Sequence, residues 1–179
     1  FGFDYLEMSV DESEEKLARL SYTQAERKDI LRAMEETEVR IHSMCLSGHR
    51  KYPLGHPDAE IQNKALRIME DAIQLADDLG IRIIQLAGYD VYYEQGSEET
   101  QQNFLRNLLR CVELAAKKGI LLGFETMETP FMDTVEKSMR YVRQVCSPYL
   151  GVYPDMGNLK NASLLYGKNV NEDIKTGKG

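Results

Sequence analysis

Two acidic residues that each close a short apolar run are the strongest chemical signal in this sequence. Glu125 follows the run 120–122, and Asp155 follows the run 150–152. If both runs are parallel strands, the two carboxylates lie side by side where α/β barrels keep their active sites. Carboxylate oxygens suit Mg²⁺ or Mn²⁺, and an added imidazole extends the range to Co²⁺ or Zn²⁺. The pattern therefore predicts that the pair holds a divalent metal and that one member moves a proton; helix capping is the alternative.

Further polar side chains are expected on the same face of the sheet. Side chains alternate between the two faces of a strand, and this alternation places Glu7 and Gln85 in the inward row with Glu125 and Asp155, each near the carboxyl end of its strand. For Glu7, the pattern favours equally a contact with a polar substrate and a structural hydrogen bond to a neighbouring strand.

Positive charge is concentrated in one loop of this acidic chain. Residues 47–55 follow an apolar run and include His49, Arg50 and Lys51. In a chain with a formal net charge of −7, such a loop suits an anion such as a sugar phosphate. A solvated loop explains the pattern equally well. His42, inside the preceding run, is expected to be a core histidine.

Strand and helix signals alternate along the chain. Apolar runs predict strands at 5–10, 39–46, 81–86, 120–126 and 150–153, and helical periodicity predicts helices at 23–38, 58–79, 97–118 and 131–145. Thr23 and Glu26 have the spacing of a capping box, and Gly80 and Gly119 each end a helix. This alternation indicates βα units on a parallel sheet.

The number of predicted strands leaves two architectures. A closed barrel needs eight strands and usually about 250 residues, so the chain is either an open doubly wound sheet or an incomplete barrel. Open sheets bind ligands at one crevice, whereas polar residues at every strand end suit a barrel mouth. We therefore predict an α/β fold, a (β/α)8 TIM barrel lacking its first and last units, as a single partial domain over 1–179. The chain opens without methionine and closes on what reads as part of another helix, so we expect both ends to be cut.

The composition of the chain argues against some classes of binding partner. The negative charge and a pI near 5.1 argue against nucleic acid or an anionic membrane as the main partner. No apolar run approaches the roughly 20 residues of a membrane span. Three cysteines without CxxC spacing do not resemble a disulfide framework, which favours the cytoplasm. The unpaired edges of an incomplete barrel predict a homo-oligomer, most simply a dimer.

Four segments resemble one enzyme family. They are YLEMSVD (5–11), SMCLSGHR (43–50), IQLAGYDVYY (84–93) and YPDMGNL (153–159). These segments are similar to the L-ribulose/L-xylulose 5-phosphate 3-epimerases of the xylose-isomerase-like TIM-barrel superfamily, some of which are labelled hexulose-6-phosphate isomerases. The resemblance covers essentially the whole chain.

The resemblance implies a metal-dependent isomerase that epimerises C3 of a ketopentose 5-phosphate, L-xylulose 5-phosphate to L-ribulose 5-phosphate, in pentose phosphate metabolism and ascorbate degradation. It implies a divalent metal (Mn²⁺, Mg²⁺, Co²⁺ or Zn²⁺) held by Glu, Asp, His and Glu, of which Glu125 and Asp155 are the first two; the other two would follow position 179. The metal would stabilise a cis-enediolate, and Glu125 would exchange the C3 proton on one face while a second carboxylate serves the other. Substrate contacts are expected from Glu7, His49, Arg50, Gln85 and Asn158.

Three other functions were weighed against this one, and two of them stay open. An aldose–ketose isomerase of the same superfamily would use similar carboxylates for a 1,2-shift. A nuclease of the endonuclease IV type shares the barrel, but it needs a histidine-rich metal cluster and a basic DNA face, and this acidic sequence offers neither. A barrel fragment that binds a sugar without turning it over is the third.

Overall fold

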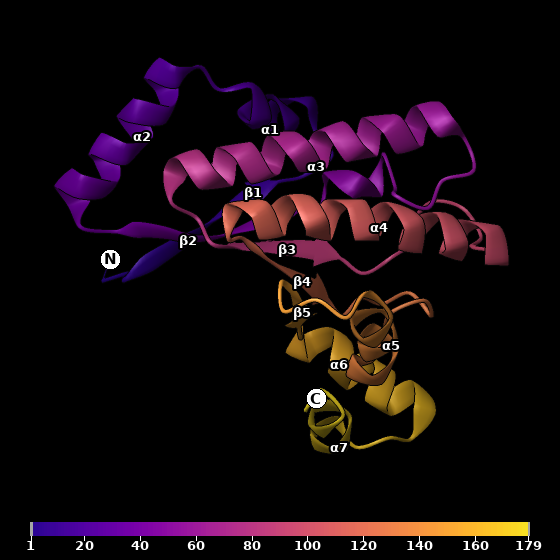
Figure 1. Cartoon of the computed structure of the whole chain (residues 1–179). Helices are drawn as coiled ribbons and strands as arrows, with labels where there is room; N and C mark the ends of the chain where they lie inside the picture. Colours follow the sequence, from indigo (N-terminus) through magenta and orange to yellow (C-terminus); the bar gives the residue numbers. More distant parts are fainter. Residues whose placement is uncertain (1, 179) are drawn as a thin grey trace.

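The computed structural model describes residues 2–178, and its centre is a sheet of parallel strands in sequence order. The strands are β1 (Tyr5–Val10), β2 (Arg40–Leu46), β3 (Ile83–Ala87), β4 (Leu121–Glu125) and β5 (Leu150–Tyr153), and each pairs with the next (Figure 1). A doubly wound sheet reverses its strand order at a switch point, whereas a barrel does not. The order therefore confirms the incomplete α/β barrel.

Helices connect the strands and continue past the last one. They are α1 (Glu14–Leu17), the 3-10 turn η1 (Ala18–Ser21), α2 (Gln24–Thr37), the 3-10 turn η2 (Gly48–Arg50), α3 (Ala59–Leu79), α4 (Glu98–Lys118), α5 (Val135–Val145), α6 (Met156–Tyr166) and α7 (Val170–Lys175). Helices α3 and α4 lie side by side over the sheet, and α5, α6 and α7 gather beyond β4 and β5 (Figure 1). No helix within residues 2–178 is both long and apolar enough to cross a membrane.

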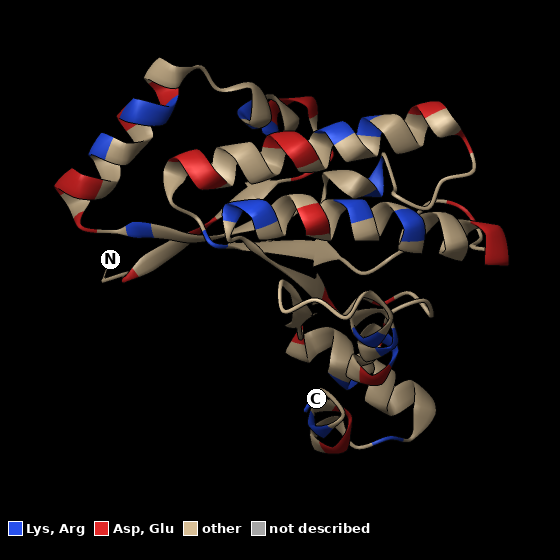
Figure 2. Ribbon diagram, viewed as in Figure 1, with Lys and Arg blue, Asp and Glu red and all other residues tan. Residues whose placement is uncertain are grey.

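Local sequence signals set the ends of the long helices. The predicted capping box of Thr23 and Glu26 is present at the start of α2. Gly80 and Gly119 end α3 and α4 in the left-handed conformation, with φ of 74° and 66°, which glycine adopts without steric cost. Charged residues recur along α2, α3 and α4, whereas β3 carries none (Figure 2).

The side chains that face the helices form the core. Met44, Ile84, Leu122 and Phe124 are 0% exposed and belong to one hydrophobic cluster with residues of α3 and α4. Full burial of an apolar side chain of this size contributes roughly 1.5–3 kcal/mol. The predicted alternation of strand side chains is therefore correct in β3 and β4, and it leaves their other row facing inward.

The sheet is strongly curved. In a flat sheet the four strand spacings between β1 and β5 would separate these strands by roughly 19 Å. The Tyr153 hydroxyl on β5 nevertheless donates a hydrogen bond to Glu7 Oε2 on β1, at 3.4 Å. The inner face is therefore the concave wall of a barrel, and a side chain on one edge reaches across it to the other.

The structure corrects several predicted elements. Helix α5 begins at Val135 rather than near residue 131, because Thr134 caps it. Helix α7 ends at Lys175, so residues 176–178 lie outside the helix that the sequence predicted there. His42 is exposed and packs its ring 5.3 Å from that of Tyr5, rather than lying in the core, because β1 and β2 shift register beside it.

Candidate active site

Glu125 lies at the end of β4 on the inner face. Its neighbours in register are Ala87 on β3 and Tyr153 on β5, and the residue is half-buried. Burial raises the pKa of the Glu125 carboxyl, and the negative charges of Asp155, Glu128 and Glu7 raise it further, while a hydrogen bond from Gln85 opposes the shift. A carboxyl with a raised pKa is a stronger base, which suits proton abstraction.

Asp155 begins α6 and is tied to the loop after β4. Its Oδ1 accepts the backbone N–H of Asn158 at 2.7 Å. One oxygen of Asp155 therefore caps the helix, which is the alternative role that the sequence left open. Thr126 joins the two loops: its Oγ1 accepts the Asp155 N–H at 2.9 Å, and its carbonyl accepts Asn158 Nδ2 at 2.9 Å. The predicted neighbours Glu125 and Asp155 are thus held together by the residue between them in space, Thr126.

The two carboxylates fit part of a metal shell. Within residues 2–178, neither Glu125 nor Asp155 forms an ion pair with a basic side chain, and Asp155 Oδ2 accepts no hydrogen bond. The negative charge of Asp155 helps to raise the pKa of Glu125, and a bound cation would relieve this repulsion. No group of three or more His, Cys, Asp or Glu within the same residues is arranged to hold a metal. Any metal held by Glu125 and Asp155 would therefore need further ligands.

Glu7 lies deeper in the barrel than predicted. Register pairs it with Ser43, in the middle of β2, so it is not at the strand's carboxyl end. Its Oε2 accepts hydrogen bonds from Ser43 Oγ and from the Tyr153 hydroxyl. Of the two alternatives for Glu7, the structure shows the structural hydrogen bond to neighbouring strands.

Four loops meet at the carboxyl ends of the strands. Tyr93 donates a hydrogen bond to Glu12 at 2.7 Å, and Tyr92 donates one to Glu128 at 3.1 Å. The guanidinium of Arg50, in the loop after β2, lies 4.7 Å from the centre of the Tyr92 ring. The loops after β1, β2, β3 and β4 therefore form one connected rim around the inner face.

His49 is separated from this rim by the core. It is 3% exposed, and its Nε2 donates a hydrogen bond to the Ala65 carbonyl of α3 at 3.1 Å. Burial lowers the pKa of His49 to about 4, so the ring is neutral at pH 7. An enclosed, neutral imidazole does not reach a ligand at the strand ends. The structure thus contradicts the expected substrate contact of His49 and makes it a core histidine.

This burial predicts a pH-dependent stability. Between its folded pKa of about 4 and the ordinary value of about 6.5, His49 binds a proton in the unfolded state but not in the folded one. The unfolding free energy therefore falls as pH is lowered, by about 3 kcal/mol between pH 7 and pH 4 from His49 alone. Urea denaturation at both pH values measures this, and His49→Gln should show a smaller decrease by that amount. An identical decrease in both proteins would contradict the assignment.

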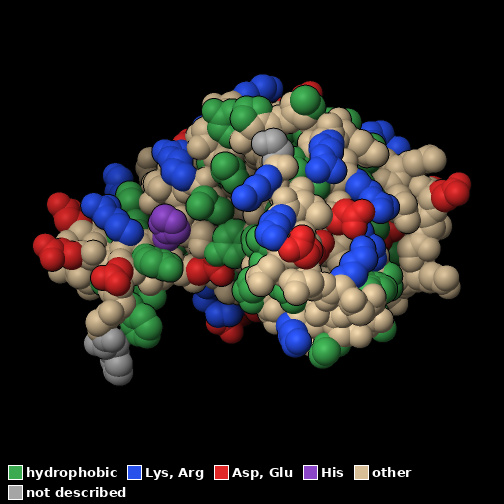
Figure 3. Space-filling view, turned by 90° about the horizontal axis from the view of Figure 1, so that it is seen from below, with side chains coloured by type: hydrophobic (Ala, Val, Ile, Leu, Met, Phe, Trp, Pro, Cys, Tyr) green, Lys and Arg blue, Asp and Glu red, His purple; other side chains and the backbone are tan. Residues whose placement is uncertain are grey.

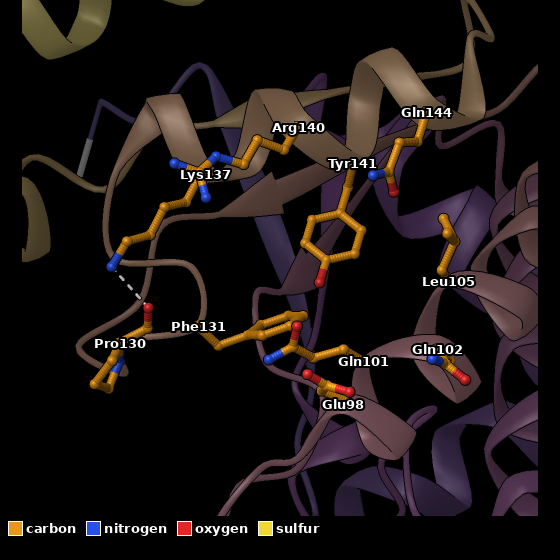
Figure 4. Close-up of a pocket in the computed structure, with 10 residues that line it drawn as sticks. All are labelled: Glu98, Gln101, Gln102, Leu105, Pro130, Phe131, Lys137, Arg140, Tyr141 and Gln144. Atoms are coloured by element: carbon orange, nitrogen blue, oxygen red, sulfur yellow. Dashed lines mark hydrogen bonds between the residues drawn. The ribbon is translucent and has the colours of Figure 1, made fainter.

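Two hollows of the described surface lie beside α4 and the loops after β3 and β4. One of about 450 Å³ lies between α4 and α5, where Phe131 and Tyr141 line it and Lys137 Nζ donates to the Pro130 carbonyl at 2.7 Å (Figure 4). An adjoining hollow of about 490 Å³ follows the loop after β3. Neither is lined by Glu125 or Asp155. Because the predicted chemistry belongs to the carboxylates, the candidate site remains the concave inner face.

Sequence reasoning missed two residues of this site. Thr126 bridges the loops after β4 and β5, and Tyr153 spans the inner face. The alternation of side chains does place Tyr153 on the inner face. Its hydrogen bond to Glu7 cannot be predicted from the sequence, because that contact depends on the curvature of the sheet.

The chain resembles known proteins in sequence and in fold. A family model, the xylose isomerase-like TIM barrel, matches residues 1–175. The chain is 47% identical over 98% of its length to a protein named "Putative L-ribulose-5-phosphate 3-epimerase SgbU" of Escherichia coli (strain K12). It is 46% identical over 88% of its length to "L-ribulose-5-phosphate 3-epimerase UlaE" of Shigella boydii. It spans 60% and 56% of these two proteins.

Solved structures agree on the fold. A D-tagatose 3-epimerase-like protein matches all of this chain with a TM-score of 0.80 at 19% identity, and the chain covers 64% of that protein. A D-psicose 3-epimerase, solved in the presence of D-fructose, matches 98% of the chain with a TM-score of 0.80 at 16% identity, and the chain covers 60% of it. At such identities the likeness shows the fold alone. The chain belongs to the xylose isomerase-like TIM barrel family.

Proposed function

We propose that this chain provides part of the active site of a sugar-phosphate epimerase that acts at C3 of a ketopentose 5-phosphate, interconverting L-xylulose 5-phosphate and L-ribulose 5-phosphate. The observation that carries the proposal is the pair of carboxylates, Glu125 and Asp155, held at adjacent strand ends by Thr126. The pair occurs in a chain 46–47% identical to proteins named L-ribulose-5-phosphate 3-epimerases.

Glu125 and Asp155 would hold a divalent metal. When bound, such a cation supplies Lewis-acid polarisation of the substrate carbonyl beside C3. The chain's own part is to fix the two ligands: β4 positions Glu125, and the cap of α6 positions Asp155 with Oδ2 left available. Asn158 supports this cap by its hydrogen bond to the Thr126 carbonyl, so it helps to position Asp155, and its contact with the substrate stays a prediction.

Glu125 would also exchange the proton at C3. Its burial and its negative neighbours make the carboxylate a better base than a solvated one. Gln85 is buried beside Glu125, and its side-chain amide favours the ionised carboxylate. A single carboxylate does not reach both faces of C3, so returning the proton to the opposite face requires a second acid/base group besides Glu125.

Epimerisation in deuterated water tests this proposal. With Mn²⁺ present, the protein should convert L-ribulose 5-phosphate to L-xylulose 5-phosphate, and NMR should show deuterium at C3 of both ketoses. Chelation should stop the exchange, and added Mn²⁺ should restore it. An aldose product would instead support the aldose–ketose isomerase. Sugar binding without exchange would support the non-catalytic barrel fragment, and either outcome would overturn the epimerase.

The surface does not favour a nuclease of the same fold. On the face shown in Figure 3, basic and acidic side chains are interleaved, whereas a DNA-binding face needs a continuous basic field. The formal net charge of −7 points the same way. A small anionic molecule suits this chain better than a nucleic acid, which agrees with the proposed sugar phosphate.

A further inference from the structure

Thr126 is a polar residue at a position where β4 otherwise places apolar side chains. Leu122 and Phe124 form the row of β4 that packs into the hydrophobic core, and both are 0% exposed. Two residues further along the same row, Thr126 is also 0% exposed. Burying a hydroxyl is unfavourable unless it forms hydrogen bonds, and valine has nearly the same shape without that cost. The reason for a hydroxyl at this position therefore lies in the bonds that it makes.

The Thr126 hydroxyl directs its hydrogen bonds at one residue, Asp155. Its oxygen accepts the Asp155 N–H at 2.9 Å, and it donates to the Asp155 carbonyl oxygen at 3.4 Å. Thr126 directly follows Glu125 in the chain. The hydroxyl therefore connects the backbone of one candidate metal ligand to the residue beside the other.

A further contact closes these bonds into a ring of three residues. The Thr126 carbonyl accepts Asn158 Nδ2 at 2.9 Å, and the Asn158 N–H donates to Asp155 Oδ1 at 2.7 Å. The ring thus includes the Asp155 carboxylate itself. One oxygen of this carboxylate is fixed by the ring, and Oδ2, which accepts no hydrogen bond among residues 2–178, stays available for a ligand.

Without this ring, the separation of the two carboxylates would depend on two independent loops. Glu125 is the last residue of β4, and sheet register fixes it beside Tyr153, the last residue of β5. The register does not extend to Asp155, which begins α6. A cation held by both carboxylates needs them in a defined arrangement. Removing a residue that orients metal ligands typically lowers metal affinity 10- to 100-fold.

We propose that Thr126 is a positioning residue that sets the divalent-metal affinity of the site by fixing Asp155 relative to Glu125. This inference rests on the proposed function for the use of the two carboxylates as metal ligands, and it does not depend on which sugar binds. Thr126 is fully enclosed, so it acts through its hydrogen bonds to Asp155 rather than by touching metal or substrate. The metal affinity would therefore depend on a hydroxyl outside the set of ligands.

Thr126→Val tests the proposal, because valine keeps the shape of the side chain and lacks only the hydroxyl. In the metal-free protein, NMR should show the Asp155 amide hydrogen exchanging roughly 10-fold faster, since this N–H loses its acceptor. Calorimetric titration with Mn²⁺ alone should show an affinity lowered by roughly 10- to 100-fold. Thr126→Ser keeps the hydroxyl and should bring both values back close to those of the unaltered protein.

Activity provides a readout that separates positioning from direct participation. In Thr126→Val, the Mn²⁺ concentration needed for half-maximal C3 exchange should rise by the same factor as the calorimetric dissociation constant. The rate at saturating Mn²⁺ should change much less, because the metal then restores the arrangement of its ligands. A lowered rate at saturating Mn²⁺ with an unchanged Mn²⁺ requirement would overturn the positioning role.

Thr134→Val is the matched control. Thr134 is also buried, and its hydroxyl also accepts one backbone N–H, that of Lys137 at 3.2 Å, but it caps α5 rather than joining Asp155. Both valine variants should unfold at lower urea concentrations than the unaltered protein. Thr134→Val should nevertheless bind Mn²⁺ with unaltered affinity. Equal weakening of Mn²⁺ binding in the two variants would assign the effect to overall stability and overturn the proposal.

The remaining outcomes distinguish this proposal from the proposed function. Unchanged Mn²⁺ affinity in Thr126→Val, or no Mn²⁺ binding by the unaltered protein, would overturn the role of Thr126. If Thr126→Val does not fold, Asn158→Leu decides, because it removes the bond to the Thr126 carbonyl. Roughly 10-fold weaker Mn²⁺ binding in that variant supports the ring, and unchanged binding rejects it. Mn²⁺ binding that depends on Thr126, in a protein without C3 exchange, would support the positioning role and reject the epimerase.

Discussion

Replacing Glu125 by glutamine is expected to lower kcat for C3 epimerisation by roughly 10²- to 10⁴-fold, the usual loss when a general acid–base group is removed. The amide keeps the size of the side chain and its place at the end of β4, but it takes no proton at neutral pH. It is also a weaker ligand for a hard cation, so calorimetric titration should show weaker Mn²⁺ binding. Steady-state kinetics at saturating substrate and metal measure the loss.

Glu128→Gln is the matched control. Glu128 is an exposed carboxylate three residues further along the same loop, and it is bonded to Tyr92 rather than facing the inner wall. We expect this variant to retain kcat within a few-fold, and both variants should unfold at similar urea concentrations. Equal losses of kcat in the two variants, or full activity of Glu125→Gln, would remove Glu125 from the proton transfer.

Gly55→Ala is expected to lower the unfolding free energy by about 3 kcal/mol, at the upper end of the usual cost of overpacking. A methyl group on Gly55 would lie 2.5 Å from the Thr100 carbonyl oxygen and 2.6 Å from that of Asp90. Both obstacles are backbone atoms, which cannot rotate away. Relief would require moving the loop that Gly55 N–H fixes to the Asp90 carbonyl at 3.1 Å. Urea denaturation followed by circular dichroism measures the change.

Gly151→Ala provides the comparison for this prediction. Gly151 lies in β5, and a methyl group there would meet only the end of the Leu121 side chain, at 3.9 Å. Its strand conformation also suits alanine, so the unfolding free energy should change by less than about 1 kcal/mol. If both glycine variants lost the same stability, the close approach at Gly55 would not be the cause.

The sequence by itself determined the elements and their faces. Caps and terminal glycines lie within a few residues of the helix ends that they define, so Asp58, Gly80, Ser97 and Gly119 predict α3 and α4 closely. Strand alternation correctly set Ile84 and Leu122 in the core. The predicted start of α5 was early, and α1 and α6 were missed, because α1 has only four residues and α6 has no clear apolar face.

Contacts between segments that are distant in the sequence decided which side chains reach the candidate site. His49 and Arg50 are adjacent in one cation-rich loop, yet the turn η2 directs the first into the core against α3 and the second to the tyrosine rim. Their sequence spacing is the same in either arrangement, because a side chain's direction in a tight turn depends on what packs around it.

The same holds for the carboxylates. The sequence determined that Glu125 and Asp155 end neighbouring strands, since each follows its own apolar run. Only the tertiary structure decided that Thr126 joins them and that Glu7, deeper in the sheet, accepts the hydroxyl of Tyr153 from the opposite edge. Local propensities act over a few residues, whereas these hydrogen bonds exist only once the sheet has curved and brought β1 and β5 within reach of one another.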